Sequence, residues 1–249
     1  MPELPGKVAI VTGGLVGIGR AISEAFVSEG ANVVIASRNK KKGEKVSEEI
    51  NSIYGKNKTI YIQTDVTDYN QVSNMVKETI ESYKKIDILV NNAGVIHICS
   101  LLHLELEDWK RVIDVNLTGS FICCKEVIPY MKKQRWGRII NISSTSGITG
   151  GTSGAAYAAA KGGLIAFTKA LSNEFAPFGI TVNSIAPSKI QTPMLKDSVD
   201  EKGKQELIKK IPVGRVGKPE EIAHFAVCLS SGLSGYITGQ VIVVSGGYI

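Results

Sequence analysis

Tyr157 and Lys161, which stand four positions apart, are the residues of this sequence best suited to move a proton. On a helix this spacing puts both side chains on one face, one turn apart. The pKa of a phenol is ordinarily about 10, and a neighbouring ammonium lowers it because it stabilises the phenolate. We therefore expect Tyr157 to serve as a general acid or base, with Lys161 lowering the pKa of its hydroxyl.

Ser144 is the third candidate for chemistry, because it follows the apolar run at residues 138–142. A strand that ends there would bring the serine hydroxyl beside the phenol, where it could hold a carbonyl oxygen. The spacing of tyrosine and lysine alone is weak evidence, since Tyr54 and Lys58 repeat it among polar residues and without such a serine. We interpret Tyr54 as a surface residue.

A glycine-rich turn near the N-terminus predicts a dinucleotide-binding site. Residues 12–19 (TGGLVGIG) separate a short apolar run, typical of a central parallel strand, from a segment with helical periodicity. In this context Gly13 permits the tight turn, Gly17 lets the backbone approach the pyrophosphate, and Gly19 lets helix and strand pack closely. The amide groups at the start of the helix favour phosphates. The alternative is a glycine turn that binds nothing.

The residues after the second predicted strand, 32–36, determine the choice of cofactor. Proteins that select NAD usually carry a carboxylate here for the ribose 2′-hydroxyl, whereas this chain has Ser37, Arg38 and Asn39. An arginine can hold a 2′-phosphate through charge-assisted hydrogen bonds. We therefore predict NADP(H), with NAD(H) as the alternative if Arg38 only stacks on the adenine.

Three further polar features belong to this prediction. Asp65 follows a predicted strand at residues 59–64, where it could receive the adenine amino group or cap the next helix. The small and amide side chains of residues 91–94 (NNAG) would let the backbone lie beside the cofactor. Asn116 lies in an otherwise apolar segment, so its amide needs partners. Those partners could be backbone carbonyls, or water in a proton path.

Predicted strands alternate with predicted helices along the whole chain. This pattern predicts an α/β fold with one Rossmann-type, doubly wound parallel sheet of about seven strands and helices on both faces. With no break in composition, we expect one dinucleotide-binding and catalytic domain over residues 1–249, in which residues 187–212 form a substrate lid. A helix is predicted over residues 154–177, and its part from Ala155 to Leu171 has few polar residues on any face, which predicts a subunit interface.

Composition argues against several classes of protein. No apolar run approaches the roughly 18 residues of a membrane span, and the first residues do not resemble a secretory signal. The net charge of +6 comes from scattered lysines without interleaved aromatic residues, so we expect no nucleic-acid partner. The four cysteines lack metal or redox spacing. We expect no metal, reduced thiols and a cytoplasmic location.

Taken together, these motifs resemble the short-chain dehydrogenase/reductase family over essentially the whole chain. The resemblance implies a seven-stranded Rossmann sheet, usually in a homotetramer that is a dimer of dimers, and hydride exchange between a nicotinamide and a carbonyl or alcohol. The motifs that carry it are the glycine turn, Asp65-Val66, Asn91-Asn92-Ala93-Gly94, Asn116, Ser144, Tyr157-x-x-x-Lys161, Pro187 with Thr192, and Gly239-Gln240.

The resemblance also implies a role for each catalytic position. Tyr157 would protonate the carbonyl oxygen while Ser144 orients it and stabilises its charge. Lys161 would lower the pKa of the phenol and bind the nicotinamide ribose, and Asn116 would hold a water that links Lys161 to solvent. The implied cofactor-binding residues are Gly13, Leu15, Gly17, Ile18, Gly19, Ser37, Arg38, Asp65, Val66, Asn92, Ala93, Gly94, Tyr157, Lys161, Pro187, Ile190 and Thr192.

The chain departs from the family pattern at three places. Ser188 follows Pro187 where the family often has glycine. Ser245 stands where aspartate is common, and Val16 replaces a basic residue that many NADP-preferring members have. The last departure weakens the expectation of NADP(H).

Within the family, the sequence is most similar to the 3-oxoacyl-carrier-protein reductases. Those enzymes hold an acidic carrier with two basic residues, and this chain has Arg135 near one position but Phe178 at the other, so carrier binding stays open. The expected substrate contacts are Ser144, Ser146, Tyr157 and Met194, and the expected walls bear few charges, which favours a 3-oxoacyl thioester or small ketone. The alternatives are a sugar, polyol or hydroxysteroid dehydrogenase, or an NADP(H) sensor without catalysis.

Overall fold

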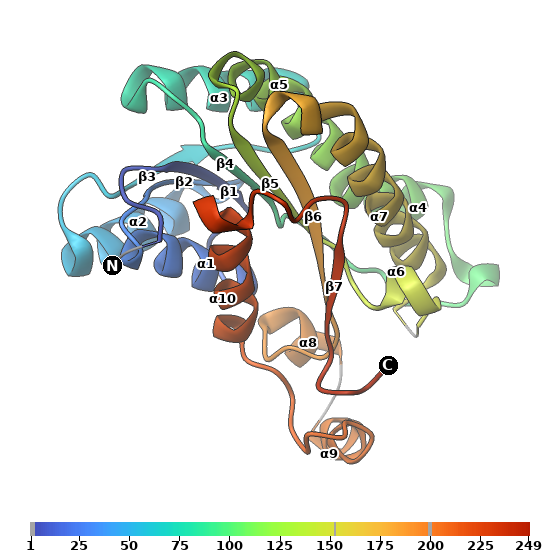
Figure 1. The fold of residues 1–249 in the computed structure, drawn as a ribbon. Coiled ribbons are helices and arrows are strands. Elements are labelled where there is room, and N and C mark those ends of the chain that lie inside the picture. Colours follow the sequence, from blue (N-terminus) through green and yellow to red (C-terminus); the bar gives the residue numbers. More distant parts are fainter. Residues whose placement is uncertain (1–2, 152, 199–200) are drawn as a thin grey trace.

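A computed structural model describes residues 3–151, 153–198 and 201–249 (Figure 1). Its centre is a seven-stranded parallel sheet with the strand order β3-β2-β1-β4-β5-β6-β7, which confirms the predicted doubly wound fold. The strands are β1 (Val8–Thr12), β2 (Asn32–Ser37), β3 (Thr59–Gln63), β4 (Ile88–Asn91), β5 (Gly137–Ile142), β6 (Ile180–Pro187) and β7 (Val241–Val244).

The central strands β1, β4, β5 and β6 are buried along their whole length, because helices cover both faces of the sheet (Figure 1). Alternate residues of one strand therefore enter two separate cores: Ala9 and Val11 pack with Phe26 on one face, and Ile10 packs with Met131 on the other. The first face is covered by α1 (Gly17–Ser28), α2 (Lys40–Tyr54) and α10 (Pro219–Ser230), and the second by α3 (Tyr69–Tyr83), α5 (Gly119–Gln134) and α7 (Ala155–Phe175).

Three segments differ from the sequence-based expectation. The apolar pattern predicts one continuous helical stretch over residues 105–133, whereas the structure has α4 (Leu106–Ile113), a π-helix η2 (Asp114–Thr118) and α5 there. Helical periodicity in the sequence begins at residue 20, but the first helix already begins at Gly17, inside the glycine turn. The polar sequence of the expected lid segment predicts a loop with one helix, and the structure has two short helices there, α8 (Pro193–Ser198) and α9 (Glu201–Lys209).

Short helical turns complete the described chain. The four-residue helix α6 (Ser146–Thr149), which the sequence pattern did not predict, follows β5. Three 3-10 turns are η1 (Leu101–His103), η3 (Ala176–Phe178) and η4 (Gly232–Ser234). Within residues 3–151, 153–198 and 201–249, no helix combines the length and the apolar character that a bilayer span needs.

The sheet reverses its winding between β1 and β4, because β2 pairs with one edge of β1 and β4 with the other. Crevices open at such a switch point, outside the carboxyl ends of the strands. Thr12 ends β1 there. Its hydroxyl accepts hydrogen bonds from the backbone amides of Asn92 (3.0 Å) and Ala93 (3.1 Å) and donates to the carbonyl of Val90 (3.3 Å). One buried hydroxyl thus fixes the loop after β4 to the end of β1.

We expect Thr12→Val to lower the free energy of unfolding by about 2–4 kcal/mol, because each buried amide left without an acceptor costs about 1–3 kcal/mol. Thr12→Ser keeps the hydroxyl and is the matched control, with a much smaller loss. Urea unfolding of the two variants measures the difference. Equal stability of Thr12→Val and the unmodified chain would contradict this role.

Candidate active site

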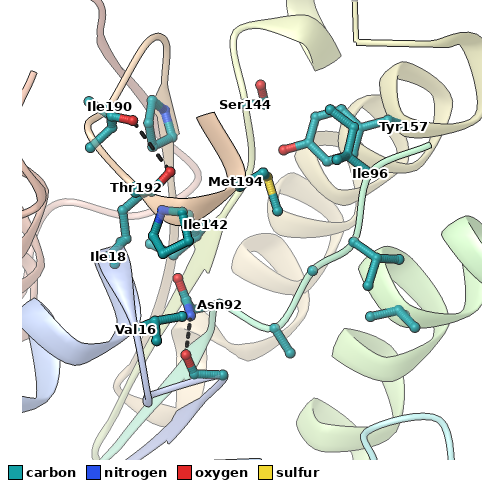
Figure 2. Close-up of a pocket in the computed structure, with 18 of the residues that line it drawn as sticks. Val16, Ile18, Asn92, Ile96, Ile142, Ser144, Tyr157, Ile190, Thr192 and Met194 are labelled. Atoms are coloured by element: carbon teal, nitrogen blue, oxygen red, sulfur yellow. Dashed lines mark hydrogen bonds between the residues drawn. The ribbon is translucent and has the colours of Figure 1, made fainter. Parts of the chain in front are cut away.

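A cavity of about 650 Å³ lies at the carboxyl ends of the strands, between the glycine turn and the start of α7 (Figure 2). Its lining includes every position expected to bind cofactor, substrate or the reacting atoms, except Gly19 and Asn116. Gly19 packs instead against Asn92 and the carbonyl of Gly13, where a side chain would collide. Asn116 lies behind the cavity wall and is fully buried.

Tyr157 and Ser144 face the cavity together, from the first turn of α7 and from the loop after β5 (Figure 2). Both residues are 9% exposed. The ring of Tyr157 packs against Val112 and Ala156 and against the loop residues Val95 and Ile96. Tyr54, the other tyrosine with a lysine four positions later, is 39% exposed at the end of α2. The structure therefore brings the expected serine and phenol to one wall of one cavity.

Burial dominates the proton chemistry of this pair. It raises the pKa of the Tyr157 phenol to about 12, and the side-chain hydrogen bond with Ser144 only partly opposes the shift. Burial also lowers the pKa of the Lys161 ammonium to about 8, since this group has no carboxylate partner among the described residues. The expected low pKa of the Tyr157 phenol is therefore not found in this structure, because desolvation outweighs the contacts that favour the phenolate.

The position of Lys161 explains that result. Its Nζ donates a 2.8 Å hydrogen bond to the carbonyl of Ile142, the last residue of β5, and lies 5.6 Å from the centroid of the Tyr157 ring. The ammonium is thus held at the end of the strand rather than on the phenolic oxygen. This contact joins the helix that carries Tyr157 to the strand that leads to Ser144.

Asn116 occupies the π-helix η2, where the widened turn directs its side chain inward. The Asn116 amide Nδ2 donates to the carbonyls of Val95 and Val112, both at 2.8 Å. Its Oδ1 is buried and has no partner within the described part of the chain. A methyl group added at Gly94 would lie 2.7 Å from this oxygen and 3.6 Å from Lys161 Nζ. The free oxygen and the ammonium therefore border the same small space.

The opposite end of the cavity carries the residues that follow β2 and β3. The hydroxyl of Ser37 is buried and has no partner within residues 3–151, 153–198 and 201–249. Arg38 Nη1 lies 4.0 Å from Asp65 Oδ2, and its side chain is 68% exposed. Asp65 does not cap α3, because Asp68 accepts from the first amides of that helix. This end of the cavity therefore has an exposed guanidinium that an anionic group could reach.

The region between the two ends fits a dinucleotide. Gly13 and Gly17 both have positive φ, +67° and +54°, in close contact with Ala93 and Thr192 respectively. Side chains at these two positions would collide with their neighbours, so glycine keeps the turn compact. The amide of Gly13 itself donates to the carbonyl of Ala36 at 2.8 Å, so a pyrophosphate would have to bind the amides that follow it in the turn. The cavity thus offers a phosphate cradle between an anion-binding end and a proton-donating end.

Among the lining residues to which the sequence assigned no role are Ser188, noted only as a departure from the family pattern, and Lys189. Lys189 adds a positive charge to walls expected to have few charges. Its Nζ lies 5.9 Å from the Tyr248 ring, and partial burial lowers its pKa. Their only signal in the sequence is their place directly after β6, whose end borders the cavity.

Comparison with known proteins agrees with this geometry. A family model described as enoyl-(acyl carrier protein) reductase matches residues 13–249. The chain is 41% identical over 247 residues to a 3-oxoacyl-(acyl-carrier-protein) reductase of Thermotoga maritima, with 99% of each chain covered. It is 42% identical over 245 residues to that of Aquifex aeolicus and 44% over 244 residues to that of Chlamydia muridarum, with 98% of each chain covered in both cases.

The crowding around Asn116 Oδ1 can be tested by a double-mutant cycle. We expect Gly94→Ala to lower the free energy of unfolding by about 1–3 kcal/mol, the usual cost of overpacking. In an Asn116→Ala background the same change should cost much less, because the oxygen it meets is gone. Gly232→Ala is the control, since its added methyl meets no atom within 4 Å. Equal costs in both backgrounds would contradict the contact.

Proposed function

The chain belongs to the short-chain dehydrogenase/reductase family, and from this premise we propose that it reduces 3-oxoacyl thioesters, delivered on an acyl carrier protein, with NADPH. It is an oxidoreductase that acts on carbonyl or alcohol groups. One observation carries the proposal: a buried serine and phenol share a cavity wall at the far end of a phosphate cradle. We assign residues 1–249 to one domain that binds the cofactor and performs the reaction.

Each catalytic residue has a role that its surroundings support. The nicotinamide, when bound, supplies the hydride. Ser144 holds the carbonyl oxygen of the substrate, and Tyr157 donates its proton to that oxygen. A phenol with a pKa of about 12 is protonated at neutral pH, so Tyr157 is already in the form that an acid needs. The nearby Lys161 ammonium then stabilises the phenolate that remains.

The proton must be replaced after each turnover. We infer that Asn116 Oδ1 holds a water beside Lys161 Nζ, because both groups border the space at Gly94 and the oxygen lacks a partner among the described residues. A water that accepts from Lys161 and donates to Asn116 would pass a proton from outside to the phenol. The roles of Asn116 and Lys161 are thus to supply protons rather than to touch the reacting carbon.

NADP(H) is favoured over NAD(H) by the residues after β2. The exposed guanidinium of Arg38 suits a 2′-phosphate, and the neighbouring Ser37, which also lines this end of the cavity, carries no charge that would repel one. Asp65 does not cap α3, but its Oδ1 accepts from the amide and the hydroxyl of Thr67, so Oδ2, which faces Arg38, is the oxygen that could receive the adenine amino group. An NAD-selective site would instead need a carboxylate at the end of β2.

An acyl substrate fits the other wall of the cavity. Met194 of α8 and Ile98 are large apolar side chains that line the opening and are 37% and 53% exposed. Ser146 adds one hydroxyl. We therefore assign residues 187–212 as the segment that covers the substrate. The curated relatives are 3-oxoacyl reductases, which disfavours a sugar, polyol or hydroxysteroid substrate and a purely sensing role.

Carrier binding is supported by two cations held against the 3-10 turn η3. Arg135 Nη2 donates to the carbonyl of Pro177 at 2.9 Å. Lys132 Nζ lies 4.2 Å from the centroid of the Phe178 ring. The surface near residue 178 therefore has a positive charge although that residue has none. An acidic carrier protein could bind both of these cations.

We propose a cytoplasmic location on a separate ground. The four cysteines are free thiols, and free thiols persist in the reducing cytoplasm.

We propose a homotetramer because a single chain exposes two separate apolar surfaces, which contact with other copies of the chain would bury. One lies on α5 and α7, where Phe121 is 47% exposed and meets Phe167 edge to face. The other follows α10 and the sheet edge at β7, with Phe225, Tyr236 and Val243 exposed. A chain that pairs with a copy of itself through each of two separate surfaces forms a dimer of dimers.

We expect Tyr157→Phe to reduce turnover of a 3-oxoacyl thioester by about 10²–10⁴-fold, because it removes the proton donor. The dissociation constant of NADPH should change by less than about twofold, since the ring stays in place. Tyr54→Phe is the control, because it makes the same chemical change at an exposed tyrosine outside the cavity. Stopped-flow turnover and fluorescence titration measure both quantities, and near-normal turnover of Tyr157→Phe would refute the mechanism.

We expect Ser37→Asp to shift the ratio of catalytic efficiencies toward NADH by about tenfold or more, because a carboxylate repels the 2′-phosphate. Ser52→Asp introduces the same charge on the exposed face of α2 and should leave the ratio unchanged. The measurement is kcat/KM with each cofactor at a fixed ionic strength. A tenfold preference of the unmodified enzyme for NADH, by the same assay, would end the NADP(H) proposal.

A further inference from the structure

Two side chains of β3, the edge strand of the sheet, hold the backbone at the end of β2. The phenol of Tyr61 donates to the carbonyl of Ser37 at 2.7 Å, and the side-chain amide of Gln63 donates to the carbonyl of Arg38 at 3.1 Å. Ser37 and Arg38 line the cavity, whereas Tyr61 and Gln63 are not part of the lining that the described residues form. The two donors therefore act on this end of the cavity from behind its wall.

These contacts lie where the regular pairing of β2 with β3 ends. Ser37 and Gln63 form the final pair of the register, and the amide of Thr64 donates to the carbonyl of Ser37 at 2.8 Å. The Gln63 side chain extends this pairing by one residue, to Arg38. The Arg38 side chain is 68% exposed, and a long exposed side chain has many rotamers. The position of its backbone therefore limits where the guanidinium can reach.

The phenol of Tyr61 reaches Ser37 by crossing the first turn of α2, which packs beside β3 (Figure 1). A Cβ added at Gly43 in that turn would collide with the ring of Tyr61. Glycine is unfavourable inside a helix, so its use here agrees with the space that the ring needs. Burial raises the pKa of the Tyr61 phenol, which keeps the hydroxyl protonated and able to donate at neutral pH.

We propose that Tyr61 and Gln63 are positioning residues for cofactor selectivity, which fix the backbone that carries Arg38 so that its guanidinium meets the 2′-phosphate of NADPH. The inference rests on the proposed cofactor. Binding costs free energy for every side chain and loop that the ligand must order, and a loop that is already fixed lowers this cost. NADH lacks the 2′-phosphate and therefore gains less from a fixed Arg38.

The test measures the dissociation constants of NADPH and NADH by fluorescence titration at one ionic strength, without turnover. We expect Tyr61→Phe, which keeps the ring, to lower the ratio Kd(NADH)/Kd(NADPH) by about threefold to tenfold, the effect of losing one neutral hydrogen bond. Gln63→Met should lower the ratio in the same direction, because methionine keeps the length of the side chain but cannot donate. Since Gln63 is exposed, this variant keeps the test decisive even if Tyr61→Phe folds poorly.

Tyr83→Phe is the matched control. The Tyr83 hydroxyl also donates to a backbone carbonyl, that of Asn57 at 3.2 Å, but this contact lies just before the amino end of β3. Tyr83→Phe should leave the ratio unchanged. If Tyr61→Phe and Gln63→Met leave the ratio unchanged as well, or weaken both cofactors alike, the inference is wrong while the proposed function stands. Tighter binding of NADH than of NADPH by the unmodified enzyme would overturn the proposed cofactor and this inference with it.

Discussion

The relative position of Tyr157 and Ser144 depends on the hydrogen bond that Lys161 Nζ of α7 donates to the carbonyl of Ile142 at the end of β5. A buried ammonium without a carboxylate needs strong acceptors, and the end of β5 provides one. The bond fixes α7 against the strand that leads to Ser144. A second pair, Asn141 Nδ2 donating to Thr168 Oγ1 at 2.8 Å, fastens the same helix two turns further on. Rotation of α7 about its axis would break both bonds, so Tyr157 has one position relative to the serine.

The same burial sets the proton chemistry of the pair. Desolvation disfavours charge, so it raises the pKa of Tyr157 and lowers that of Lys161. Before substrate arrives, the phenol keeps its proton and the ammonium is held near the point of losing one. A growing negative charge on a carbonyl oxygen beside Ser144 would reverse this balance, because it favours proton donation by the phenol. A protonated phenol is the form that reduction of a carbonyl requires, which agrees with the role proposed for Tyr157.

Much of this fold could be predicted from the sequence, because a strand covered on both faces needs a continuous apolar run and a glycine turn needs glycines. The π-helix at residues 114–118 could not, since its residues have the same composition as an ordinary helix. The ionisation of Tyr157 was predicted wrongly for a related reason. Spacing shows that Lys161 is near, but burial and the competing carbonyl of Ile142 appear only when strands distant in sequence are assembled.

Some residues of this site are proposed to contact parts that all dinucleotides share, and others line the end of the cavity where the reaction would occur. The glycine turn and the end of β2 are the proposed contacts of the phosphates and ribose, which every dinucleotide carries, and their spacing within one βαβ unit allows them to be predicted from sequence. The loop after β6 also lines the cavity, and the sequence assigned no role to its residues Ser188 and Lys189. Their significance depends on β7 and on the loop after β5, which hold the backbone of this loop through Val244 and Thr145. Selectivity for the reacting group thus arises where three distant segments meet, and single motifs do not encode it.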